Sequence, residues 1–135
     1  MTSKKVVVIP CSGIGKPIGT VSRETAYEVV RLRSDIAETA CLASLTSGDK
    51  EAIKKIKNNY CITLDGCAKH CALKNTEACG KTPEKSYMIL KFAAENRDMK
   101  PEGMVDIGEG GRALVKTISK KIISDMDEIL QDEKK

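Results

Sequence analysis

The first half of the chain alternates short apolar runs with turns made of polar or small residues. Residues 5–10 and 60–64 are rich in β-branched and aliphatic side chains, which is typical of buried strands. Residues 86–92 form a similar run and predict a third strand, although a helix that continues through Ala94 is an alternative. Residues 35–47 are apolar and small, and their pattern does not decide between helix and strand.

Between these runs the apolar residues recur at helical spacing. We expect helices over residues 21–32, 50–57 and 68–78, with Asp49 as the N-cap of the second. A last helix is predicted because its apolar residues share one face. These residues are Leu114, Val115, Ile118, Ile122, Met126, Ile129 and Leu130. The glycines within residues 108–111, which precede this helix, predict a flexible segment.

Strands that alternate with helices favour a parallel sheet with right-handed crossovers. We therefore expect a small three-layer α/β domain, with a parallel sheet of three or four strands and helices on both faces. The length of 135 residues suits one domain over residues 1–131, followed by a solvated tail over residues 132–135. In such sheets, binding sites form beyond the carboxyl ends of the strands.

Composition and charge limit the partners and the cellular compartment that we expect for the protein. A net charge of +4 and an aromatic content of 3% provide neither the basic surface nor the stacking platform of a nucleic-acid-binding protein. No apolar run approaches the ~20 residues of a membrane span, and residues 1–8 lack the pattern of a signal peptide. We therefore expect a cytoplasmic protein without nucleic-acid or membrane partners. In that reducing compartment, the six cysteines are expected to be metal ligands, nucleophiles or buried residues, not disulfide partners.

Cys67 and Cys71 form a Cys-x3-Cys pair at the predicted start of a helix. Residues four apart lie on one helical face, roughly 5–6 Å apart at Cβ, so both thiolates can bind one metal ion. The positive end of the helix dipole also favours the thiolate. Just before them, Asp65 and Gly66 suit a tight turn, in which the carboxylate either binds exposed backbone amides or orients a metal ligand. The alternative is that both cysteines are small residues on a buried helix face.

The remaining cysteines differ in what their surroundings indicate. Cys11 ends the first strand at a small-residue turn, where it can be a ligand or a nucleophile activated by the backbone amides of that turn. Cys41 lies in an apolar stretch and by itself also fits a core residue. Cys61 lies inside a predicted strand and is expected in the core, while Cys79 is expected to be half-exposed. His70, the only histidine, is expected at the surface instead of on a metal.

Three motifs together resemble a known family, the DGC-domain proteins. They are Cys-Ser-Gly at 11–13, Cys-Leu-Ala at 41–43, and Asp-Gly-Cys at 65–67 followed by Cys71. The resemblance implies a zinc ion bound by four shared cysteines, an assignment that itself rests on the cysteines. In this chain they map onto Cys11, Cys41, Cys67 and Cys71. The chain departs from the family where Ala-Lys-His follows Asp-Gly-Cys, since a proline is frequent there in the family.

Three functions are compatible with these residues, and they leave open whether the protein is an enzyme. The first is zinc binding for metal handling, sensing or regulation, since a domain of this length should fold without a structural metal. The second is a thiol enzyme with Cys11 as nucleophile for sulfur or phosphoryl transfer. Pro17 stands where low-molecular-weight phosphatases place an arginine, which weakens the phosphoryl version. The third is an iron–sulfur protein, although the usual Cys-x2-Cys runs are missing.

Overall fold

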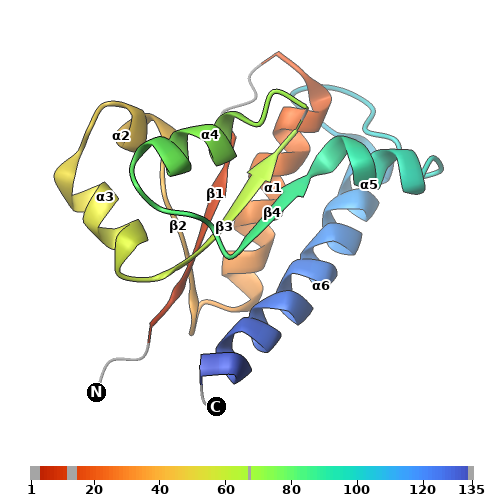
Figure 1. Ribbon diagram of the computed structural model, residues 1–135. Helices are drawn as coiled ribbons and strands as arrows, with labels where there is room; N and C mark the ends of the chain where they lie inside the picture. The colour runs from red at the N-terminus through yellow and green to blue at the C-terminus, as the bar shows by residue number, and fades with distance from the viewer. Residues whose placement is uncertain (1–3, 12–14, 67, 134–135) are drawn as a thin grey trace.

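A single parallel sheet organises the protein (Figure 1). The computed structural model describes residues 4–11, 15–66 and 68–133, and within them four strands pair in the order β2-β1-β3-β4. All three pairings are parallel, as predicted. The strands are β1 (Val6–Pro10), β2 (Ala37–Thr39), β3 (Tyr60–Asp65) and β4 (Lys85–Met88).

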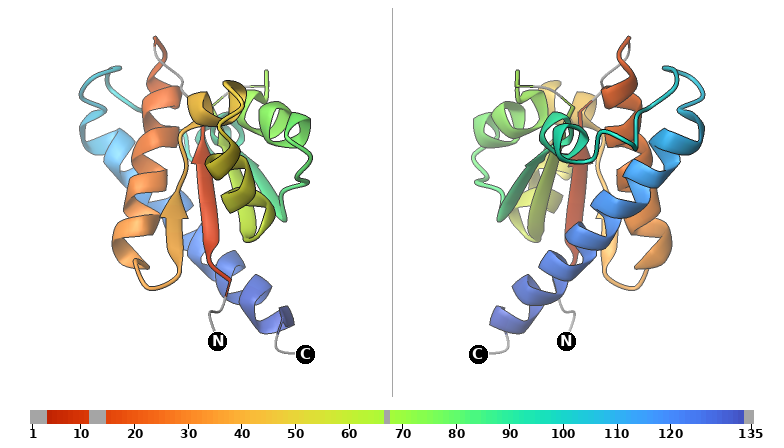
Figure 2. Two further views of the ribbon diagram at one scale, coloured as in Figure 1. Left: turned by 90° about the vertical axis from the view of Figure 1, so that its left-hand side faces the viewer. Right: turned by 90° about the vertical axis from the view of Figure 1, so that its right-hand side faces the viewer.

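Helices cover both faces of this sheet (Figure 2). One face carries α1 and α6, and the opposite face carries α2, α3 and α4, while α5 follows β4 directly. The helices are α1 (Pro17–Leu32), α2 (Leu42–Thr46), α3 (Lys50–Lys57), α4 (Cys71–Ala78), α5 (Ile89–Glu95) and α6 (Gly108–Glu133). The expected three-layer α/β domain is therefore confirmed.

Alternation along β1 divides the core into two layers. Val6 and Val8 pack into the cluster that contains the apolar residues of α1 and α6. Val7 and Ile9 pack on the other side, against the apolar residues of α2, α3 and α4. Successive strand residues point to opposite faces, and here both faces are covered. This is why the run is apolar at every position instead of at every second one.

Several element boundaries differ from those predicted. Helix α1 begins four residues early, at Pro17, because proline suits the first helical position, where no N–H is needed. The predicted strand over 86–92 is half strand and half helix, since β4 ends at Met88 and α5 begins at the next residue. The undecided residues 35–47 contain both β2 and α2. The predicted N-cap is confirmed, because the Asp49 carboxylate accepts the Glu51 N–H at 3.0 Å.

The glycines at 108–111 form the first turn of α6 instead of the predicted flexible segment. A Cβ added to Gly110 would lie 2.1 Å from the carbonyl oxygen of Lys100, and one added to Gly111 would lie 2.4 Å from the Cβ of Ile107. The preceding loop therefore folds back onto the start of α6, and glycine is required for this close approach. Within the described residues, neither α6 nor any other helix is long and apolar enough to cross a membrane.

The close approach at Gly110 predicts a stability change of unusual sign. In an ordinary helix Gly→Ala stabilises by roughly 0.5–1 kcal/mol. We expect Gly110→Ala instead to lower the free energy of unfolding by about 1–3 kcal/mol, because the added methyl group overlaps the Lys100 backbone. Urea denaturation measures this change, and Glu109→Ala, at an exposed neighbouring position, is the control. A Gly110→Ala protein more stable than the wild type would contradict this account of the loop.

Candidate functional site

Three neighbouring strands each lead, at their carboxyl ends, to a cysteine. Cys11 directly follows β1, Cys41 follows β2 after one intervening residue, and Cys71 begins the helix that follows β3. Because β2, β1 and β3 are adjacent and parallel, these three turns lie along one edge of the sheet (Figure 1). Cys67 is in the same β3–α4 connection by sequence, and it lies outside the described residues.

Cys11 connects the ends of β1 and β3 to helix α1. Its N–H donates to the Leu64 carbonyl at 2.8 Å, and its sulfur accepts the N–H of Gly66 at 3.3 Å. The thiol in turn lies 3.6 Å from Ser22 Oγ, and that hydroxyl donates to the Leu64 carbonyl at 2.9 Å. With 8% of its surface exposed, Cys11 is held in a defined position but is almost covered.

Asp65 caps helix α4 from the end of β3. The residue is 1% exposed, and its carboxylate accepts the N–H groups of Ala72 at 2.6 Å and Leu73 at 3.1 Å. These are two of the four N–H groups that the first turn of a helix leaves without an internal partner. Of the two roles predicted for Asp65, binding of exposed backbone amides is therefore confirmed.

Gly66 lies against the start of α1. A Cβ at this position would be 3.2 Å from the backbone of Ile18 and of Gly19, so a larger residue would push the helix away from the sheet. The N–H of Gly66 donates to Cys11 Sγ, and its carbonyl accepts the N–H of Leu90 at 3.1 Å. Gly66 thus joins the sheet edge to α1 and α5 through its backbone.

The helix after Asp-Gly-Cys starts later than predicted. It begins at Cys71 instead of residue 68, because His70 has left-handed backbone angles (φ 54°, ψ 45°) that no α-helix accommodates. The predicted helix over residues 68–78 therefore lacks its first three residues, and the predicted pairing of Cys67 with Cys71 lies outside the described residues. His70 is half-buried, with Nδ1 3.9 Å from the Asp65 carboxylate.

Cys41 and Cys71 are both exposed at the first residues of helices. Cys41 is the N-cap of α2, and the nearby backbone N–H groups of Ser44 and Ala43 lower the pKa of its thiol. Its exposure excludes the core position that its apolar neighbours allowed. A thiol with a lowered pKa supplies more of the thiolate form, which is the form that binds metals and attacks electrophiles.

The other two cysteines lie away from this edge. Cys61 is fully buried inside β3, where burial, with a smaller contribution from the charge of Glu84, raises the pKa of its thiol to about 12. It is a core residue, as predicted. Cys79 is half-buried at the end of α4, with its sulfur 3.5 Å from the Leu45 carbonyl of α2.

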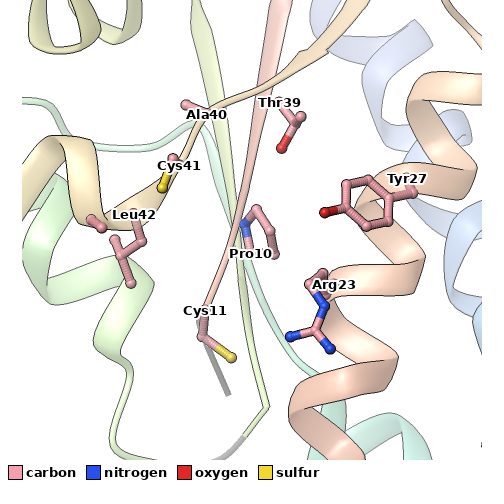
Figure 3. A pocket seen from close by; sticks show the side chains of 9 residues that line it. Pro10, Cys11, Arg23, Tyr27, Thr39, Ala40, Cys41 and Leu42 are labelled. Atoms are coloured by element: carbon pink, nitrogen blue, oxygen red, sulfur yellow. The ribbon is translucent and has the colours of Figure 1, made fainter. Parts of the chain in front are cut away.

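A pocket of about 330 Å³ lies between helix α1 and the ends of β1 and β2 (Figure 3). Cys11 and Cys41 line it from the ends of β1 and β2, and Arg23 and Tyr27 line it from α1. Figure 3 shows the arginine and the tyrosine reaching toward β1, with the Cys11 sulfur turned to the side of α1. The sequence interpretation missed both α1 residues. Their only signal is a spacing of four, which places them on one helical face after the Cys11 turn.

The described residues alone do not present an assembled metal site. No three His, Cys, Asp or Glu side chains among them form a group that could hold a metal ion. Cys11, Cys41 and Cys71 therefore share a sheet edge without meeting at one point. The predicted approach of Cys11 and Cys67 lies outside the described residues.

The capping role of Asp65 predicts a specific loss of stability. Asp65→Ala leaves the Ala72 and Leu73 N–H groups without their acceptor, so we expect the free energy of unfolding to fall by about 2 kcal/mol. Asp49→Ala removes the exposed cap of α3 and is the matched control, with an expected loss of about 1 kcal/mol. Urea denaturation compares the two variants, and a smaller loss for Asp65→Ala than for Asp49→Ala would contradict this role.

Comparison with known proteins identifies a family and no individual relative. Neither the search of curated proteins nor that of solved structures gave a match. The family model of the DGC domain matches residues 7–118, a range that includes all of the four strands except Val6 and includes the four cysteines of the predicted site. The protein belongs to the DGC domain family.

Proposed function

We propose that this protein binds one zinc ion per chain through the thiolates of Cys11, Cys41, Cys67 and Cys71, in metal handling, sensing or regulation. The observation that carries this proposal is the placement of Cys11, Cys41 and Cys71 after the carboxyl ends of three adjacent parallel strands. Membership of the DGC domain family is consistent with metal binding. Four thiolates are also a donor set that suits the borderline-soft zinc ion.

The local electrostatics support thiolates at this edge. Backbone N–H groups lower the pKa of Cys41, and the N–H of Gly66 already points at Cys11 Sγ. Hydrogen bonds of this kind stabilise a sulfur that carries negative charge and orient metal-bound thiolates. For Cys11 to bind a metal, its thiol proton, now directed at Ser22 Oγ, must leave.

A role in metal handling, sensing or regulation fits better than a structural one. Both apolar layers of the core are filled by strand and helix residues without help from a metal. In addition, Cys11, Cys41 and Cys71 do not form a ready three-ligand group among the described residues. Binding by all four cysteines would therefore require the turns at 41 and 71 to shift relative to β1. A site that assembles only when surface turns move can signal metal binding through that movement, and it can release the metal again.

The first test is the metal content of single Cys→Ser variants purified without oxygen. We expect about one zinc per chain in the wild type and a clear loss in the Cys11, Cys41, Cys67 and Cys71 variants, since each removes one of four bonds. Cys79→Ser, outside this set and half-buried, is the control and should keep its zinc, as should Cys61→Ser. Full zinc in the Cys67 and Cys71 variants, or iron with inorganic sulfide in place of zinc, would end the proposal.

The pocket supports a second candidate, a thiol enzyme with Cys11 as nucleophile. Cys11 lines a 330 Å³ pocket together with the guanidinium of Arg23, which could hold an anionic sulfur or phosphoryl substrate. Against this, the thiol is 8% exposed and is engaged by Gly66 and Ser22. A reactive cysteine is normally open to its substrate, so we rank this candidate second.

Alkylation mapping with and without a chelator separates the two candidates. With zinc bound, the four proposed ligands should resist a substoichiometric alkylating agent near neutral pH, because the metal occupies the sulfur lone pairs. After chelation we expect Cys41 to react far ahead of Cys61, whose pKa is about 12 and whose side chain is buried. Peptide mass spectrometry reads the sites. Fast labelling of Cys11 that a chelator does not change would favour the thiol enzyme.

A further inference from the structure

The pocket beside Cys11 has properties of a ligand site that are independent of any metal. Its volume of about 330 Å³ lies within the range of small-molecule sites, roughly 300–1,000 Å³. It lies beyond the carboxyl ends of β1 and β2, which is where ligands of open parallel sheets bind. At about 30 Å³ per water-sized group, it has room for roughly ten non-hydrogen atoms.

The chemistry of the walls indicates what kind of molecule fits. Arg23 is the one charged side chain among the described residues that line the pocket, and it brings a fixed positive charge. A planar guanidinium matches a carboxylate in both charge and shape. The Tyr27 side chain, one helical turn further along α1, also extends toward the pocket (Figure 3) and can add a hydroxyl donor.

Apart from Thr39 and the two cysteines, the rest of the lining is apolar. Pro10, Ala40, Leu42 and Ala43 come from the ends of β1 and β2 and the start of α2. They line the pocket together with Arg23 and Tyr27 and offer contact area to a short hydrocarbon chain. Sites of this type combine an apolar surface with a few placed polar groups that fix the orientation of the ligand.

We propose that this pocket binds a small organic monocarboxylate, with its carboxylate on Arg23 and Tyr27 and its short apolar body against Pro10, Ala40 and Leu42. A molecule in this position covers the pocket sides of Cys11 and Cys41. The site would therefore place a small acid directly beside the two thiols. This proposal does not depend on the proposed zinc site, although the two share these cysteines.

The test uses hexanoate and its uncharged analogue hexanamide, which have nearly the same shape. Each is titrated through the millimolar range into the reduced, ¹⁵N-labelled full chain, and amide chemical shifts are followed. We expect saturable shifts at residues 40–43 and at Arg23 with hexanoate, and roughly tenfold weaker binding of hexanamide, because the amide cannot form the charge-assisted pair. Equal binding of both probes, or the absence of saturable shifts at these residues, would overturn the proposal.

Variants of residues on α1 test whether Arg23 provides the charge that binds the carboxylate. Arg23→Gln should remove the preference for hexanoate over hexanamide, and Tyr27→Phe should weaken hexanoate binding by a few-fold. Arg31→Gln is the matched control, since Arg31 is exposed, pairs with Glu28 and does not line the pocket. Equal losses in Arg23→Gln and Arg31→Gln would show a general charge effect and overturn the assignment to Arg23.

Measuring the zinc content of each titrated sample distinguishes a failure of this proposal from a failure of the proposed function. Protein that holds zinc but does not bind hexanoate overturns only the carboxylate pocket. Protein that binds hexanoate without ever holding zinc overturns only the four-cysteine metal site.

Discussion

The buried carboxylate of Asp65 is the group on which the sheet edge depends. Removing a carboxylate from water costs several kcal/mol unless hydrogen bonds replace its hydration. Here the N–H groups of Ala72 and Leu73 supply those bonds, and the positive end of α4 adds a favourable field. Because the carboxylate is fixed at the end of β3, the first turn of α4 is fixed as well. The position of Cys71 therefore follows from a contact made six residues earlier in the chain.

The same corner of the sheet sets the position of Cys11. Gly66 can approach α1 closely because it has no side chain, and at that distance its N–H reaches the Cys11 sulfur. The aspartate and the glycine of the Asp-Gly-Cys motif thus have structural roles, one for α4 and the other for α1 and β1. Their value to a metal site is indirect, since they hold the turns that carry the thiols. This explains how a short motif can accompany cysteines that lie far from it in sequence.

Much of the fold could be predicted because it depends on local patterns. Val6 to Ile9 are all buried, and such an uninterrupted apolar run predicts a central strand. The Asp49 cap is likewise predictable from residue type and position. The late start of α4 could not be predicted, because nothing in the residue type requires left-handed angles at His70. The pocket was missed for a different reason. Arg23 and Tyr27 meet the ends of β1 and β2 only after α1 has packed on the sheet, so their spacing of four on α1 does not by itself reveal the pocket.

The apolar core and the sheet edge that bears the cysteines therefore have different roles. The apolar layers on either side of β1 account for the fold and make no use of the thiols at the edge. Cys41 and Cys71 can consequently remain exposed at helix starts without weakening the core. Exposed thiols that do not meet at one point would make a poor structural metal site, because each ligand must be drawn in when the ion binds. The same arrangement would suit the reversible zinc binding proposed above, since any energy spent in moving the turns would lower the affinity and let the ion leave without unfolding the domain.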